Sequence, residues 1–217
     1  MVEIASRDWI YNWCRLIMTS LRGTLQAAVF NRNTRIFAMS DIVWPAEYLP
    51  GITDNYVSNK VIIPGLSASQ VWPSLNDTTA WPSYYANVAD IRFHDGSGPE
   101  LSVGARFRFT TFSFPVEAEI TEYVQPRPGQ PARVAWHGWV EGDAERRLDV
   151  HHAWLIEDLS GGRVRVLTQE TQIGQPAKKL AATKPNPMLN AHQDWLDGLI
   201  RHARAWEGPE IGASISV

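Results

Sequence analysis

The chain has 217 residues, of which 44% are apolar, enough for one large domain or one domain with an appendage. A net charge of -3 at pH 7 gives no general attraction to nucleic acid, and the sequence contains no phosphate-binding glycine loop. The single cysteine, Cys14, excludes an internal disulfide framework and a cysteine-based zinc site. We therefore expect a cytoplasmic protein without a cofactor.

The N-terminal end is predicted to form an extension, residues 1–43, built around a helix at residues 7–30. Its apolar run is interrupted by Asn12, Arg15 and Arg22, so we expect neither a secretory signal nor a membrane span. Because arginines outnumber acidic residues at this end, three roles stay open. The helix could pack on its own domain, associate with a second copy, or lie against an anionic membrane surface.

The remainder is predicted to form one domain, residues 44–207, and a loose tail, residues 208–217. Its start, residues 44–51, reads as an irregular linker because of the Pro50-Gly51 turn. Alternating or β-branched runs predict seven strands, at residues 55–64, 90–94, 105–112, 116–124, 133–140, 148–158 and 163–174. Short helices are expected at residues 67–75 and 81–87, and a long helix, broken at residues 184–187, closes the domain.

The last two predicted strands carry polar residues on the same side as apolar ones. Read with a two-residue period, His152 shares a face with Trp154, and Glu170 shares one with Val166. Burying an unpaired polar group costs on the order of a few kcal/mol, so a sheet that only covered a core would not point them inward. This pattern favours a sheet that lines a cavity.

Several local motifs resemble those of the SRPBCC superfamily, the START-like or polyketide cyclase/dehydrase group. The matching residues are Ser69-Gln70-Val71-Trp72, Leu75, Asp77, Trp81-Pro82-Ser83-Tyr84, Leu101 to Phe107, Trp136, Gly138, His152 to Ile156, Gly162-Arg163-Val164, Glu170, Gly174 and His192 to Leu199. The resemblance spans about residues 44–206 and implies an α+β helix-grip fold. In that fold a bent, seven-stranded antiparallel sheet wraps around a long C-terminal helix, with two short helices after the first strand.

Two functions follow from this expected architecture. The first is binding of a hydrophobic small molecule, such as a lipid, a polyketide or an aromatic compound, between the sheet and the last helix. The residues expected to line that site are Trp72, Trp81, Tyr85, Phe107, Phe109, Trp136, Trp154, Gln172 and Trp195. The alternative is a cyclase/dehydrase-like enzyme in which Glu170, His152 or His192 serves as general acid or base.

Other chemistries find less support in the sequence. His151 and His152 are adjacent on a strand and point to opposite faces, so we predict no metal site. No Gly-x-Ser-x-Gly elbow is present, and no spacing suggests a nucleophilic triad. Two further readings remain open: the inward polar groups could simply hydrogen-bond one another, and a β-bulge could turn Glu170 outward.

Overall fold

A computed structural model describes residues 40–205, and everything said of the structure concerns this part of the chain. The unit that contains the described residues begins at Ser40. The predicted helix at residues 7–30 and the predicted tail at 208–217 lie outside the described residues. Between residues 40 and 205, no helix is long and apolar enough to cross a membrane.

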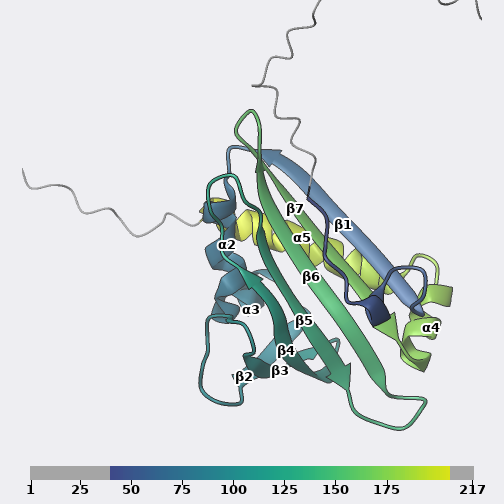
Figure 1. Cartoon of the computed structure of the whole chain (residues 1–217). Helices are drawn as coiled ribbons and strands as arrows, with labels where there is room; N and C mark the ends of the chain where they lie inside the picture. The colour runs from purple at the N-terminus through teal and green to yellow at the C-terminus, as the bar shows by residue number, and fades with distance from the viewer. Residues whose placement is uncertain (1–39, 206–217) are drawn as a thin grey trace, which may run out of the picture. The chain divides into compact units, whose positions relative to one another are not determined.

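One antiparallel sheet of seven strands dominates the structure (Figure 1). Its strands are β1 (Asn55–Pro64), β2 (Val88–Phe93), β3 (Arg106–Thr111), β4 (Phe114–Val124), β5 (Ala132–Val140), β6 (Leu148–Leu159) and β7 (Arg163–Ile173). Their order in the sheet is β1-β7-β6-β5-β4-β3-β2, so the first and last strands of the chain are neighbours. The seven predicted strands and their antiparallel pairing are confirmed.

Helices occupy the two predicted places along the chain, and a short 3-10 helix lies in addition within the segment predicted as an irregular linker. The described helical elements are η1 (Ala46–Tyr48), α2 (Ala68–Asn76), η2 (Thr78–Ala80), α3 (Trp81–Tyr84), α4 (Gln175–Ala182) and α5 (Pro187–Ala205). Ser67 is the N-cap of α2, and its backbone N–H donates a hydrogen bond to the Gln70 side chain at 2.9 Å. The break predicted at residues 184–187 separates α4 from α5.

The second short helix is shorter than predicted. It ends at Tyr84, whereas the sequence pattern suggested a helix to residue 87. Tyr85 instead has extended backbone angles, and its ring stacks on Trp195 of α5 with 4.5 Å between ring centroids. This contact between distant residues outweighs the local preference for helix.

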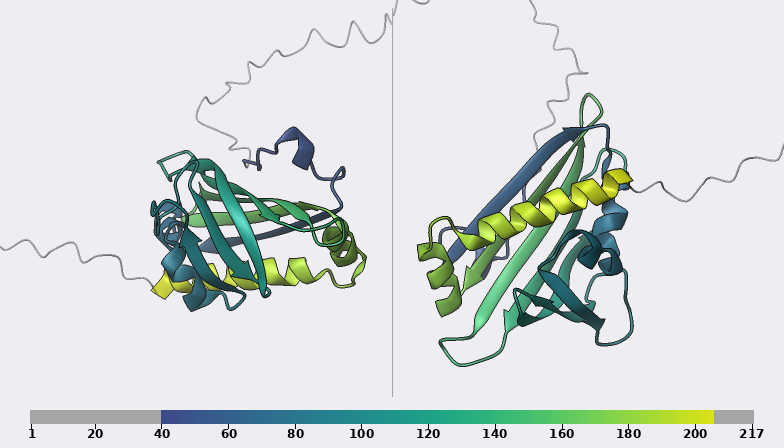
Figure 2. Two further views of the ribbon diagram at one scale, coloured as in Figure 1. Left: turned by 90° about the horizontal axis from the view of Figure 1, so that it is seen from below. Right: turned by 180° about the vertical axis from the view of Figure 1, so that it is seen from behind.

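Helix α5 crosses the concave face of the sheet, as the two views of Figure 2 show. It buries Trp195, Leu196 and Leu199 against the sheet and the short helices. The helix comes close to α3 because residue 198 is glycine: a Cβ atom there would overlap the carbonyl oxygen of Tyr84. The helix-grip arrangement is thus confirmed, and its interior is the site of the apolar core.

The other face of the sheet is partly covered by the segment 40–54, which we call the strap. Ile42 and Trp44 of the strap pack on outward-facing residues of β5, β6 and β7, namely Ala135, Ala153, Leu155 and Leu167. A buried ion pair between Arg165 and Glu157, at 2.8 Å, holds the start of the strap. The Ser40 N–H donates to the Glu157 carboxylate, and the Arg165 guanidinium donates to the Ser40 carbonyl oxygen. The sequence pattern predicts only an irregular linker at residues 44–51 and gives no sign that this segment covers the sheet, because one Trp among prolines has no periodic pattern.

His151 lies under the strap and provides a test of its packing. The rings of Trp44 and Tyr48 lie 5.5 Å from the His151 ring, and neither ring nitrogen has a hydrogen-bond partner. Burial, together with the neighbouring His152 and His137, lowers the pKa of His151 to about 4. The imidazole is therefore neutral at pH 7 and carries unpaired polar atoms.

We expect His151→Phe to raise the free energy of unfolding by about 1–2 kcal/mol at pH 7, because it removes a buried polar group without partners. The gain should be larger at pH 5. Between about pH 6.5 and pH 4 the unfolded histidine binds a proton that the folded one does not, and this costs wild-type stability. Urea denaturation at both pH values measures the effect. The control is His137→Phe, since His137 is partly exposed and bonds to Asp149 at 3.3 Å; an equal gain there would contradict the explanation.

Candidate functional site

A group of polar side chains is buried between the sheet and α5, and we call it the buried cluster. It consists of Glu170, His152, His192, Thr168 and Gln172, each at most 5% exposed. His152 on β6 and Glu170 on β7 are directly opposite in the register, which is unbroken along both strands. No bulge turns Glu170 outward, so the inward orientation predicted from the two-residue period is confirmed. His192 completes the cluster from α5.

Glu170 is the centre of the cluster. One carboxylate oxygen, Oε2, lies 3.0 Å from Nδ1 of His152 and 3.3 Å from Nε2 of His192. The other, Oε1, accepts a hydrogen bond from the Gln172 amide at 2.5 Å. Both oxygens therefore face donors. A carboxylate that accepts several hydrogen bonds is stabilised in its charged form even when buried.

The electrostatics agree with this geometry. Burial alone would raise the pKa of Glu170, but the hydrogen bonds and charge interactions with His152 and His192 outweigh it and hold the pKa well below its ordinary value. Burial lowers the pKa of His152 to about 4, aided by His192 and opposed by Glu170. At neutral pH the cluster thus contains an ionised carboxylate and a neutral His152.

Two asparagines extend the network toward the surface. Asn55 of β1 donates to Gln172 at 2.7 Å, and Asn186, just before α5, donates to Asn55 at 2.8 Å. The sequence pattern does not place either asparagine at the site. Asn55 begins the first predicted strand on an inward position, but nothing in its neighbours marks it as polar and buried.

The hydrogen-bond directions leave one atom without a partner. His152 Nδ1 faces the carboxylate and so carries the proton, which leaves its Nε2 to accept from the Thr168 hydroxyl at 2.8 Å. His192 likewise donates from Nε2 to Glu170, so its Nδ1 is an acceptor. That Nδ1 atom is buried and has no hydrogen-bond partner. The cluster therefore has one unused acceptor in its interior.

His152, Glu170 and His192 also form a group of possible metal ligands, because their donor atoms lie within 4.8 Å of one another. The orientation of the rings does not suit an ion. The two imidazoles are stacked, with 4.5 Å between centroids and 9° between planes. A metal bound by a histidine nitrogen lies near the plane of its ring, and two stacked planes cannot both contain it. Without rotation of one ring, the cluster is a hydrogen-bonding group.

Aromatic rings surround the cluster, and Trp195 of α5 is their common neighbour. Its ring centroid lies 5.6 Å from those of His152 and Trp154, and 5.2 Å from that of Trp81. Trp136 lies 4.5 Å from the His152 ring and 6.2 Å from that of Trp195. The space between the sheet and α5 beside the cluster is therefore filled by indole rings in this structure.

The sequence-predicted ligand residues all point inward. Their side chains are at most 7% exposed; they are Trp72, Trp81, Tyr85, Phe107, Phe109, Trp136, Trp154, Gln172 and Trp195. All except Gln172 belong to one apolar core. Two of them reach hollows at the surface, Trp72 beside Pro73 and Tyr85 beside Gly198. The structure thus brings the predicted residues together, as a packed aromatic interior.

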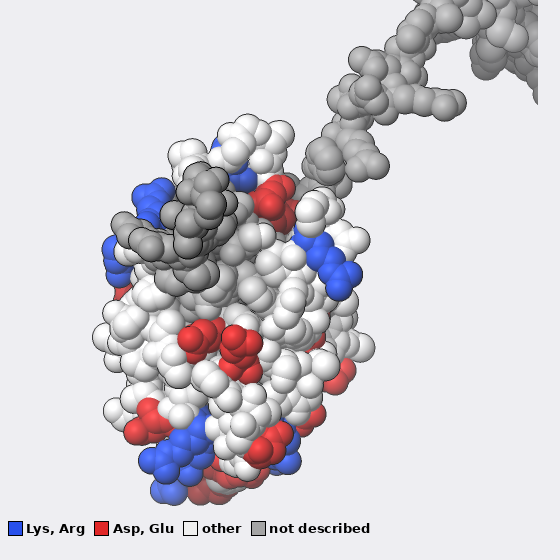
Figure 3. All heavy atoms as spheres, turned by 90° about the vertical axis from the view of Figure 1, so that its left-hand side faces the viewer, with Lys and Arg blue, Asp and Glu red and all other residues white. Residues whose placement is uncertain are grey.

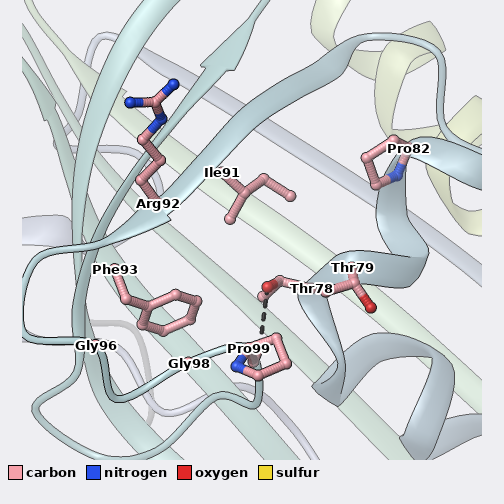
Figure 4. A pocket seen from close by; sticks show the side chains of 9 residues that line it. All are labelled: Thr78, Thr79, Pro82, Ile91, Arg92, Phe93, Gly96, Gly98 and Pro99. Carbon is pink, nitrogen blue, oxygen red and sulfur yellow. Dashed lines mark hydrogen bonds between the residues drawn. The ribbon is translucent and has the colours of Figure 1, made fainter.

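A third surface hollow, of about 590 Å³, lies between β2, the loop at residues 96–99 and the short helices η2 and α3 (Figure 4). Ile91 and Phe93 of β2 point into it, while the Arg92 side chain points away along the strand. The loop is fastened to η2 by Thr78, whose hydroxyl donates to the Pro99 carbonyl at 2.9 Å. On the described surface seen from the left of Figure 1, charged side chains of both signs gather toward the lower end (Figure 3).

Comparison with solved structures finds a relative and supports the fold. The hypothetical protein jhp0584 from Helicobacter pylori is 46% identical, with a TM-score of 0.74 over 77% of this chain and 98% of its own. The chain belongs to the same family as jhp0584. The di-domain ARO/CYC protein BexL, from the BE-7585A biosynthetic pathway, shares the helix-grip fold at 11% identity and a TM-score of 0.51. No family model and no curated protein sequence matches the chain.

Coverage differs between the structures that share the fold. The BexL match covers 71% of this chain and 48% of BexL, so the chain spans about half of that di-domain protein. TTHA0849 from Thermus thermophilus is matched over 99% of its length at 17% identity and a TM-score of 0.51. At these low identities BexL and TTHA0849 support the fold of this protein alone, and its ligand has to be inferred from its own residues.

Proposed function

We propose that this protein binds a hydrophobic small molecule, with an aromatic body and one hydroxyl group, between the sheet and α5. The observation that carries the proposal is the unpaired Nδ1 of His192 beside an aromatic interior. A buried acceptor without a partner costs about 1–3 kcal/mol, which a ligand hydroxyl would recover. The ligand takes the space that the Trp195 ring occupies in this structure, so binding requires this ring to move.

The buried cluster supplies the polar end of this site. Glu170 is held by three donors and orients His192, whose Nδ1 then accepts the ligand's proton donor. Trp136 and Trp154 offer flat surfaces on either side of His152. Such a combination of apolar walls with a few convergent polar groups is typical of small-molecule sites.

Native mass spectrometry of the freshly purified protein, followed by denaturing extraction, tests the proposal first. A stoichiometric apolar passenger is the expected result. Binding of 2-naphthol and naphthalene, measured by tryptophan fluorescence, then tests the polar contact. We expect His192→Phe to weaken 2-naphthol binding about tenfold and to leave naphthalene unchanged. An empty protein that binds neither compound would overturn the proposal.

A second candidate is proton transfer of the cyclase/dehydrase kind, and one specific arrangement favours it. A carboxylate that holds the Nε2–H of a histidine orients the imidazole and makes its Nδ1 a better base. Glu170 and His192 have this relation at 3.3 Å. BexL, which shares the fold, is an ARO/CYC protein. Turnover of a flexible polyketide substrate, abolished by Glu170→Gln, would support this function, and binding without turnover would favour the first.

A further inference from the structure

The surface hollow of Figure 4 is the outer end of a continuous row of aromatic rings. Phe93, which lines the hollow, stacks on Phe107 with 5.3 Å between centroids. Phe107 lies 6.2 Å from Trp81, and Trp81 lies 5.2 Å from Trp195. Trp195 contacts His152 of the buried cluster. Each ring in the row touches the next, from the surface to the polar end of the proposed site.

From this continuity we propose that the hollow is the port through which a flat, uncharged aromatic ligand reaches the interior. This inference rests on the proposed function and adds the route by which the ligand enters. A ligand seated between Ile91 and Pro82 meets apolar walls first, and moves inward by replacing one ring contact with another. Such exchange keeps apolar surface buried at every step, which lowers the barrier compared with passage through a polar layer.

The chemistry of the hollow points to an uncharged ligand. Its walls are mainly apolar: Ile91, Phe93, Pro82 and Pro99. The guanidinium of Arg92 is directed away from it, and the Thr78 hydroxyl already donates to the Pro99 carbonyl. No charged group in the described part of the hollow faces inward to hold an anion or a cation. The opposite end of the sheet interior, near Asn55 and Asn186, is closed by hydrogen-bonded amides.

Opposite changes to two residues of the hollow test the port. Ile91→Phe narrows the hollow and Phe93→Ala widens it. We expect Ile91→Phe to lower both the association and the dissociation rate of 2-naphthol by about tenfold, and Phe93→Ala to raise both. The equilibrium constant should change by less than about twofold in Ile91→Phe, because a port alters the path and leaves the bound state unchanged. Stopped-flow fluorescence measures both rates.

The matched control is Ile62→Phe, which makes the same change on an exposed position of β1, away from the hollow. Its rates should equal those of the wild type. If 2-naphthol binds the wild type but the rates of Ile91→Phe and Phe93→Ala are unchanged or shift in the same direction, the port is wrong and the proposed function stands. If 2-naphthol does not bind the wild type at all, both fail. Circular dichroism verifies that each variant is folded.

Discussion

Replacing Trp195 by alanine is expected to lower the free energy of unfolding by about 3–5 kcal/mol, as is usual for a large aromatic side chain removed from a core. Trp195 is 3% exposed and touches Trp81, Tyr85, Trp136 and Trp154 as well as His152. Its removal leaves a cavity bounded by rigid rings, which cannot collapse to fill it. Urea denaturation at pH 7 measures the loss.

Trp139→Ala is the matched control for this prediction. Trp139 lies on the outer side of β5, partly exposed, with the Arg106 guanidinium 5.6 Å above its ring. Its truncation should cost about 1 kcal/mol, as is usual for a partly exposed side chain. Equal losses at the two positions would show that Trp195 is not the centre of the core. The same comparison bears on function, since Trp195→Ala should also bind naphthalene without the need to displace a ring.

Glu170→Gln is expected to cost about 2–4 kcal/mol at pH 7, although it changes few atoms. The carboxylate accepts from Gln172, His152 and His192. A glutamine amide presents a donor where one of these donors already points, so at least one buried group loses its partner. The measurement is urea denaturation at pH 7, with Glu119→Gln as control, since the Glu119 side chain is 48% exposed and its salt bridge is long.

The pH dependence of the same variant distinguishes the contribution of the Glu170 carboxylate to stability from the contribution of the histidines. The folded-state pKa of Glu170 is lowered, so wild-type stability from this group is present above its ordinary pKa and is lost as pH falls through and below it. The folded-state pKa of His152 is lowered to about 4, so its contribution is lost earlier, between about pH 6.5 and pH 4. Above pH 5 we expect the Glu170→Gln variant to remain less stable than the wild type. Below about pH 4.5 its free energy of unfolding should change less with pH than that of the wild type. An unchanged pH dependence in this acid range would contradict an ionised Glu170.

Much of the fold could be predicted from the sequence because its signals are local. The two-residue period predicted which residues of β6 and β7 face inward, and the structure pairs His152 with Glu170 on that face. The apolar residues of α5 recur at helical spacing, and Trp195, Leu196 and Leu199 among them are buried, whereas Leu189 is 40% exposed. Leu189 lies in the first turn of α5, where Asn59 of β1 donates to its carbonyl oxygen at 3.1 Å while its side chain stays exposed.

The sequence by itself therefore determined the element order, the inward parity of each strand and the residue types of the interior, since these depend on neighbours in the chain. Tertiary structure alone decided that the tryptophans fill the space beside Glu170, that Asn55 and Asn186 join its network, and that residues 40–54 cover the outer face. These contacts join residues that are distant in the sequence, and their geometry depends on how close α5 approaches the sheet. The two-residue period predicts that a side chain faces inward. How closely α5 approaches the sheet decides whether that side chain contacts a ligand or another aromatic ring.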